Sequence, residues 1–115
     1  MAVAMFVRSP GLDPREYDRV IASLELDVSP PAGQLLHVAV ETQDGVEAIE
    51  VWQTPAAALA YVERRLAPAL AAVKAAEPEV ELVPLHNLFA PDLDAIGLIG
   101  GVSLPAHLAG VALRR

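Results

Sequence analysis

Hydrophobic positions along the chain follow two different periods, which predict four strands and two helices. Short apolar runs rich in β-branched residues predict strands at residues 2–8, 34–42, 46–53 and 79–86. Apolar residues at helical spacing predict two helices, which begin after the capping residues Asp13 and Thr54. The resulting order, βαββαβ, predicts an α+β fold of the ferredoxin-like type. That fold has a four-stranded antiparallel sheet with two helices on one face.

Each predicted helix carries a local start signal and an apolar stripe. Asp13, Pro14 and Glu16 match a capping box with proline at the first helical position. The buried stripe of the first helix is predicted to be Tyr17, Val20, Ile21 and Leu24. The stripe of the second helix is predicted to be Leu59, Val62, Leu66, Ala69, Leu70 and Val73.

Two prolines mark irregular positions inside the predicted elements. Pro68 lies within the second helix and cannot donate a backbone hydrogen bond, so it predicts a kink or break there. Pro84 lies within the last strand and predicts an edge strand or a bulge. In a ferredoxin-like sheet the last strand lies at an edge, where proline is tolerated.

The central hairpin carries the polar residues of greatest interest. Asp44-Gly45 is a strong hairpin signal that favours a type I′ turn, and a two-residue loop there places His37 opposite Trp52. Alternation then gives one strand face His37, Trp52 and Glu50 together with small alanines. The opposite face is aliphatic apart from Glu47 and consists of Leu36, Val38, Val40, Ile49 and Val51.

The mixed face of the hairpin has the features of a small-molecule site, because small residues leave room beside a few polar groups. We expect His37 and Glu50 to be catalytic, with His37 as the general acid or base and Glu50 orienting it or a water. The candidate substrate-binding residues are Trp52, Tyr17 and His86. The structural alternative is that His37 and Trp52 are only a cross-strand pair that packs in the core.

The segment "IEVWQTPAAALAYVERRLAPAL" carries a resemblance to a known superfamily. Together with the element order, it resembles the dimeric α/β-barrel superfamily, to which the antibiotic-biosynthesis-monooxygenase-like proteins belong. These proteins often have Glu-x-Trp at the end of the third strand, then a small polar cap and an apolar helix. Glu50, Trp52 and Thr54 match that pattern, and the resemblance covers approximately residues 1–89.

This resemblance implies a homodimer in which two sheets form a barrel, with a pocket of small-molecule size in each subunit. Some members are cofactor-free oxygenases, polyketide cyclases, lactone isomerases or heme-degrading oxygenases. The second helix lacks the histidine that heme-degrading members place there. The quinone-forming members have an asparagine upstream of the tryptophan, where this chain has Ala48, and a tyrosine just after it, where the nearest helix tyrosine here is Tyr61.

Composition limits the remaining classes of function. The net charge of −7 argues against nucleic-acid binding, and the absence of cysteine excludes disulfides and thiolate metal sites. His37 and His86 lie on opposite edges of the predicted sheet, so no metal and no cofactor is expected. No apolar run approaches a membrane span and no signal peptide is evident, so we expect a cytoplasmic protein without membrane contact. The abundance of Ala, Pro and Arg suggests a bacterial source.

Two hypotheses for function follow. The first is a cofactor-independent oxygenase, cyclase or isomerase that acts on an apolar aromatic or polyketide-like molecule. The alternative is a non-catalytic binding or interaction module that keeps the dimer without chemistry. In either case residues 1–89 form the α/β-barrel domain. Residues 90–115 form an apolar extension that we expect to pack on the barrel or on the partner subunit.

Overall fold

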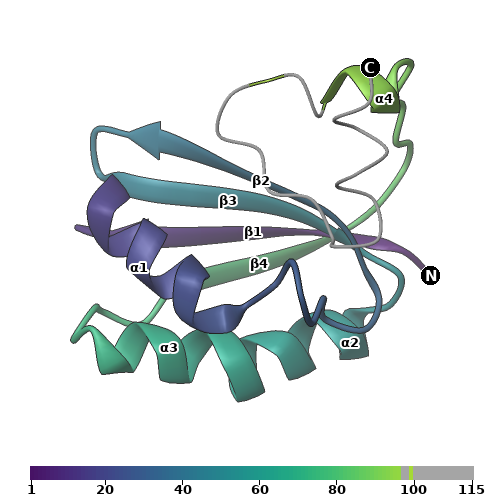
Figure 1. The fold of residues 1–115 in the computed structure, drawn as a ribbon. Coiled ribbons are helices and arrows are strands. Elements are labelled where there is room, and N and C mark those ends of the chain that lie inside the picture. Colours follow the sequence, from purple (N-terminus) through teal and green to yellow (C-terminus); the bar gives the residue numbers. More distant parts are fainter. Residues whose placement is uncertain (97–98, 100–115) are drawn as a thin grey trace.

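The computed structural model describes residues 1–96 and residue 99, and it confirms the predicted α+β, ferredoxin-like fold (Figure 1). The four strands form one antiparallel sheet in the order β2-β3-β1-β4. Helices α1, α2 and α3 cover one face of this sheet (Figure 1). The elements are β1 (Val3–Pro10), α1 (Pro14–Leu24), β2 (Gln34–Thr42), β3 (Gly45–Trp52), α2 (Pro55–Tyr61), η1 (Val62–Leu66), α3 (Ala67–Ala72), β4 (Glu79–Pro84) and α4 (Leu93–Ile96).

The predicted local signals are present in the structure. The Asp13 carboxylate accepts a hydrogen bond from the Glu16 backbone N–H at 2.8 Å, and the Glu16 side chain accepts one from the Asp13 backbone at 3.1 Å. This capping box satisfies N–H groups that have no partner within the helix. Thr54 caps α2 through the Ala57 N–H at 3.1 Å. Pro84 ends β4, which lies at an edge of the sheet as predicted.

The second helical segment is continuous in Figure 1, but its hydrogen bonding changes in the middle. Residues Val62–Leu66 form a π-helical turn, η1, which stands between α2 and α3. The irregularity expected at Pro68 is therefore a π turn just before it. The predicted apolar stripe was wrong at Leu59, which is half-exposed, because Ala58 and Tyr61 are the buried residues of α2. Leu66 and Leu70 are buried as predicted. The five-residue step from Tyr61 to Leu66 fits the wider π turn, which keeps both side chains on the buried face.

The hairpin loop lies one residue earlier than predicted, which shifts the cross-strand pairing by two residues. Thr42 pairs with Gly45, so the two-residue loop is Gln43-Asp44, and His37 pairs with Glu50 rather than with Trp52. The type I′ expectation fails as well, because that turn needs positive φ at both loop residues. The positive φ, 139°, belongs to Gly45. A register shift of two residues preserves the faces, so the predicted separation of side chains still holds.

The helices cover the mixed face of the sheet. The core contains Val3, Met5 and Val7 of β1, which pack with residues of β3 and of all three covering helices. We call the other face the distal face. Strand pairing places on it Ala4, Phe6, Arg8, Leu36, Val38, Val40, Glu47, Ile49, Val51 and Val83.

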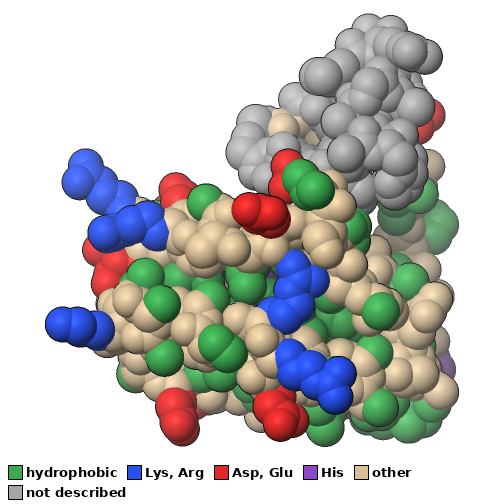
Figure 2. Space-filling model, turned by 60° about the horizontal axis from the view of Figure 1, so that its bottom comes forward, with side chains coloured by type: hydrophobic (Ala, Val, Ile, Leu, Met, Phe, Trp, Pro, Cys, Tyr) green, Lys and Arg blue, Asp and Glu red, His purple; other side chains and the backbone are tan. Residues whose placement is uncertain are grey.

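The helix side of the molecule shows no single basic patch in Figure 2, where basic and acidic side chains are scattered among hydrophobic ones. Among the described residues, no helix combines the length and hydrophobicity that crossing a membrane requires. Beyond β4 the chain passes through α4, and Phe89, Leu93 and Ile99 are exposed. The predicted packing of residues 90–115 falls mostly on residues 97, 98 and 100–115, which lie outside the description.

Candidate functional site

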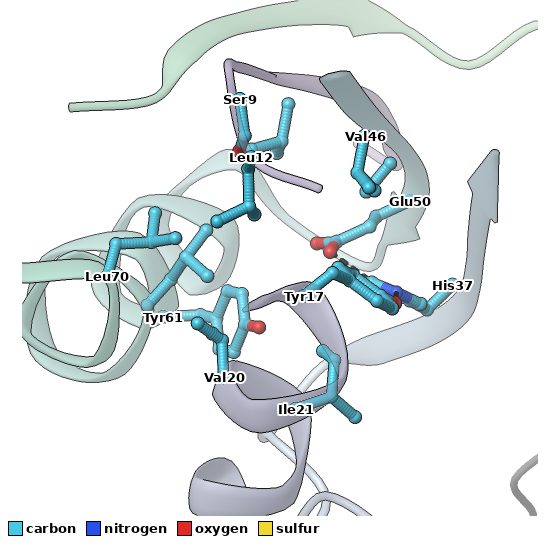
Figure 3. A pocket seen from close by; sticks show the side chains of 13 residues that line it. Ser9, Leu12, Tyr17, Val20, Ile21, His37, Val46, Glu50, Tyr61 and Leu70 are labelled. Carbon is cyan, nitrogen blue, oxygen red and sulfur yellow. Dashed lines mark hydrogen bonds and ion pairs between the residues drawn. The ribbon is translucent and has the colours of Figure 1, made fainter. Parts of the chain in front are cut away.

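Four side chains from α1, β2 and β3 form a continuous hydrogen-bonded series, which we call the polar chain. Trp52 Nε1–H donates to Glu50 Oε1 at 2.9 Å. The other oxygen, Glu50 Oε2, lies 2.7 Å from His37 Nδ1. His37 Nε2 lies 2.8 Å from the Tyr17 hydroxyl, and the dashed lines of Figure 3 mark contacts of this series.

Glu50 is the buried centre of the polar chain. The residue is only 1% exposed, and each of its carboxylate oxygens has a hydrogen-bond donor. Two donors compensate the carboxylate for the water it loses on burial. Because a carboxylate can only accept, His37 must carry a proton on Nδ1. In the neutral imidazole this leaves Nε2 as the acceptor.

Tyr17 is the outer end of the polar chain. Burial, followed by the charges of Glu50 and Asp18, raises the pKa of Tyr17 to about 12. The phenol is therefore protonated at neutral pH, and its O–H donates to His37 Nε2. The His37 side chain is 22% exposed, so the end of the chain at Nε2 lies close to solvent while Glu50 does not.

A cavity between the sheet and the helices adjoins the polar chain. Its volume is about 20 Å³, which is enough for one water-sized group. Its polar lining consists of Ser9, Tyr17, His37, Glu50 and Tyr61. The remaining walls are aliphatic and are formed by Val7, Leu12, Val20, Ile21, Val46, Ala48, Leu66 and Leu70. Figure 3 shows Tyr61 and Tyr17 reaching this space from different helices.

Sequence reasoning missed Tyr61 as a site residue. It is 3% exposed, ends α2 and packs against Trp52 with ring centroids 5.2 Å apart. Burial, together with the nearby charge of Glu50, raises the pKa of Tyr61 well above its ordinary value. The signal was present in the sequence, because Ala58 and Tyr61 are three residues apart and share a helix face. The predicted stripe passed through Leu59 instead.

The structure brings three of the five predicted site residues together at the cavity, namely His37, Glu50 and Tyr17. Trp52, a candidate substrate-binding residue, is 0% exposed, does not line the cavity and donates a hydrogen bond to Glu50. His86 is exposed beyond the end of β4, at the opposite edge of the sheet from β2, and does not line the cavity. Within the described part of the chain, no three His, Cys, Asp or Glu side chains are grouped as metal ligands.

Comparison with known proteins identifies the fold. No family model and no curated protein matches the sequence. Among solved structures, NE2512 from Nitrosomonas europaea, a protein of unknown function, is 21% identical with a TM-score of 0.60. That match covers 78% of this chain and 94% of the other.

Two further matches have names that describe a function. SnoaB, a cofactor-independent oxygenase from Streptomyces nogalater, is 19% identical with a TM-score of 0.56, over 76% of this chain and 95% of that one. A candidate antibiotic biosynthesis monooxygenase from Chloroflexus aurantiacus is 22% identical with a TM-score of 0.53, over 77% and 98%. The chain therefore has the ferredoxin-like fold of the antibiotic-biosynthesis-monooxygenase-like proteins. The predicted resemblance is confirmed at the level of fold.

Proposed function

We propose that this protein binds an apolar small molecule between its helices and its sheet, and that His37 and Glu50 catalyse proton transfer on that molecule. The observation that carries the proposal is the 2.7 Å contact between Glu50 Oε2 and His37 Nδ1 in a histidine that lines the cavity. A histidine oriented by a buried carboxylate is a common general base. The reaction class is a cofactor-independent isomerase, cyclase or oxygenase acting on an apolar aromatic or polyketide-like substrate.

The proposed mechanism begins at His37 Nε2. The Tyr17 hydroxyl is hydrogen-bonded to this nitrogen, so it must rotate away or relay the proton. Nε2 then takes a proton from a C–H group of the substrate, whose electron pair stays on the substrate as a carbanion. Glu50 stabilises the imidazolium, and Trp52 holds Glu50 in place. Returning the proton to another atom gives isomerisation, and the same first step can precede cyclisation or reaction with dioxygen.

SnoaB supports the proposal indirectly, because it is a cofactor-independent oxygenase with the same fold. This likeness does not assign a role to any residue of this chain. The roles proposed for His37, Glu50 and Tyr17 rest on their contacts in this structure.

Hydrogen–deuterium exchange tests proton transfer without knowledge of the natural substrate. Aromatic ketones with acidic C–H groups, such as 1-tetralone and anthrone, would be incubated with the protein in D2O and followed by NMR. We expect exchange above the buffer rate, reduced about 10²-fold or more in His37→Ala, which is the lower end of a general base's contribution. Glu63→Gln, at an exposed position of η1, is the control. No exchange above buffer with any ketone would contradict the catalytic proposal.

The alternative function, a binding module without chemistry, is favoured by two observations. The cavity is small and every member of the polar chain already has a partner. Such a protein would bind ketones but would not exchange their protons. Calorimetric binding of the same ketones, measured beside the exchange rates, separates the two functions.

We also propose that the protein is a homodimer of the bacterial cytoplasm and that the partner covers the distal face. Val38 and Val40 of β2 are each 42% exposed on that face, whereas the helix-side residues of the neighbouring strand β3 are buried. Adjacent exposed aliphatic side chains on a sheet commonly mark an interface. Light scattering should give twice the mass of the chain at micromolar concentration, and Val38→Glu should give the monomer. A monomeric wild-type protein would contradict the proposal.

The apolar extension, residues 90–115, is proposed to pack on the barrel or on the partner subunit. The exposed side chains of Phe89 and Leu93 at its start support this, because they extend the apolar surface beyond β4. Truncation after Phe89 should lower the melting temperature or dissociate the dimer. Unchanged melting and mass would refute this role.

A further inference from the structure

Helix α1 forms one wall of the cavity that adjoins the polar chain. Tyr17, Val20 and Ile21 of this helix line the cavity, and Figure 3 shows them on the helix that borders the space. The enclosed volume of about 20 Å³ admits one water-sized group and is too small for the carbon skeleton of an apolar ligand. A ligand of that kind can therefore enter only if part of the wall moves away.

The two ends of α1 are attached to the rest of the molecule in different ways. Before the helix, backbone hydrogen bonds fix the chain to the sheet, because Gly11 donates to the Asp44 carbonyl at 2.7 Å and Val46 donates to the Leu12 carbonyl at 3.1 Å. After the helix, the chain enters residues 25–33, a loop before β2 in which most side chains are exposed. The beginning of α1 is thus a fixed point, and its C-terminal end is the part with room to move.

Arg65 of η1 provides the polar attachment of that C-terminal end. Its guanidinium donates to the Leu24 carbonyl at 2.6 Å and to the Ser29 carbonyl at 3.0 Å. Among the described residues, no other hydrogen bond joins Val20–Leu24 to another helix or strand. The last turn of α1 has no basic residue of its own, so its unpaired carbonyl groups depend on this cation from η1.

The neighbouring arginine shows that this contact is specific. Arg64 is exposed and has no hydrogen bond or ion pair to any described residue, whereas Arg65 is partly buried and makes two hydrogen bonds. Both residues belong to the π turn, which also keeps Leu66 in the core. The pair therefore offers a matched comparison of one arginine that holds α1 with one that does not.

We propose that Arg65 is a positioning residue that holds α1 closed, and that the C-terminal end of α1 swings away from the sheet to admit the ligand. This inference rests on the proposed function and specifies how the site opens. Tyr17 lies on the same helix, and its hydroxyl is 2.8 Å from His37 Nε2. A swing of α1 removes the wall and takes Tyr17 from the nitrogen that must receive the substrate proton.

Native-state hydrogen exchange on the full chain tests this opening without a ligand. In the wild-type protein, the amides of Val20–Leu24 should exchange about tenfold or more faster than those of β1 and β3, because α1 opens locally while the central strands open only on global unfolding. Arg65→Met removes the guanidinium and should raise the ratio of α1 to strand exchange by a further factor of about ten. Arg64→Met should leave the ratio unchanged. Arg65→Lys, which keeps the charge without the two-pronged geometry, should give an intermediate ratio.

The association kinetics of 1-tetralone, followed by the fluorescence of Trp52 in a stopped-flow instrument, test whether the opening admits a ligand. If α1 must open first, the observed rate levels off at the opening rate when the ketone concentration is high. Arg65→Met should raise this plateau about tenfold, and Arg64→Met should not. A contact that only stabilised the fold would lower the melting temperature in Arg65→Met and leave the plateau unchanged.

The outcomes separate this inference from the proposed function. Exchange of α1 at the same rate as the strands in the wild-type protein overturns the proposal, and this measurement does not require that any variant folds. An Arg65→Met protein with the wild-type exchange ratio, or with the wild-type plateau, overturns it as well. If 1-tetralone does not bind at all, the proposed function fails, and the exchange ratios still decide whether Arg65 holds α1 closed.

Discussion

Glu47 and Glu50 lie on the same strand but on opposite faces of the sheet, and they differ in burial and in the partners of their carboxylates. Glu50 is buried and binds His37 at 2.7 Å and Trp52 at 2.9 Å. Glu47 is paired with Arg8 at 3.5 Å on the distal face, where both side chains are partly exposed. A buried carboxylate depends on its partners for stability, whereas an exposed one is solvated by water in either case.

The two faces of the hairpin also do not follow the simple rule that the more hydrophobic face of a sheet is the buried one. The helices cover the face that carries His37 and Glu50, while the more aliphatic face leaves Val38 and Val40 exposed. A polar face can be buried when its polar groups bind one another. An aliphatic face left exposed in one subunit is best explained by a partner, which the proposed dimer supplies.

The largest expected effect comes from breaking the polar chain at its centre. Glu50→Ala leaves the Trp52 and His37 N–H groups without their acceptor and leaves a cavity, so it should destabilise the protein by about 3–5 kcal/mol. Glu47→Ala is the matched control on the other face and should change stability by at most about 1 kcal/mol. Urea unfolding followed by Trp52 fluorescence measures both. Equal effects of the two variants would remove the distinction between the faces.

The register that separates the two faces depends on Gly45. Its φ of 139° disfavours other residues, and an added Cβ would clash with the Ser9 backbone oxygen. Gly45→Ala should therefore cost about 1–3 kcal/mol through backbone strain alone. Gly11→Ala, at a positive φ with open space around the added Cβ, is the control for strain without a clash and should cost less. Thermal unfolding of both variants gives the comparison.

The outer end of the polar chain should respond to alkaline pH. Tyr17 ionises at its ordinary pKa of 10.0 in the unfolded chain but at about 12 in the folded protein. The unfolded state therefore loses its proton first, and stability should fall as the pH rises from 10 to 12. Tyr17→Phe should reduce this fall without abolishing it, because Tyr61 behaves similarly.

The same substitution has a smaller effect at neutral pH. Tyr17→Phe removes one hydrogen bond to His37 and should cost about 0.5–1.5 kcal/mol. Denaturant unfolding at pH 7 and pH 11 tests both expectations. If Tyr17→Phe loses as much stability at pH 11 as the wild-type protein, ionisation of Tyr17 does not cause the alkaline loss of stability.

The smallest effect is expected on the distal face. Arg8 contacts Glu47 and Glu81 at 3.5 Å, and these side chains are substantially exposed. Arg8→Ala should therefore change stability by at most about 1 kcal/mol, and added salt should reduce the difference further. A large effect that persists in salt would mean that Arg8 is buried in the assembled protein. In that case its contribution should depend on protein concentration, which unfolding at two concentrations would reveal.

The sequence alone determined the order of the elements and the faces of the strands. Asp13 and Glu16 form a capping box from neighbouring residues, and the signal for it is local. The strict alternation of the strands places His37, Glu50 and Trp52 on one face for any register shift of an even number of residues. For the same reason, the candidate pair His37 and Glu50 was identified before their contact was known.

Tertiary contacts decided the register, because the partners of the hairpin turn come from elsewhere in the chain. The Asp44 carbonyl accepts a hydrogen bond from the Gly11 N–H, and the Val46 N–H donates one to the Leu12 carbonyl. The loop after β1 therefore holds the turn at Gln43-Asp44 instead of at Asp44-Gly45, which the local sequence favours. Likewise, the π turn allows Tyr61 and Leu66, five residues apart, to lie on the same buried face of the helix. We attribute this turn to the packing of both side chains in the core. Trp52 became a buried donor to Glu50 and not a cavity wall because α2 places Tyr61 against it. Local patterns specify which face a side chain occupies, and only the packed structure specifies which neighbour it meets there.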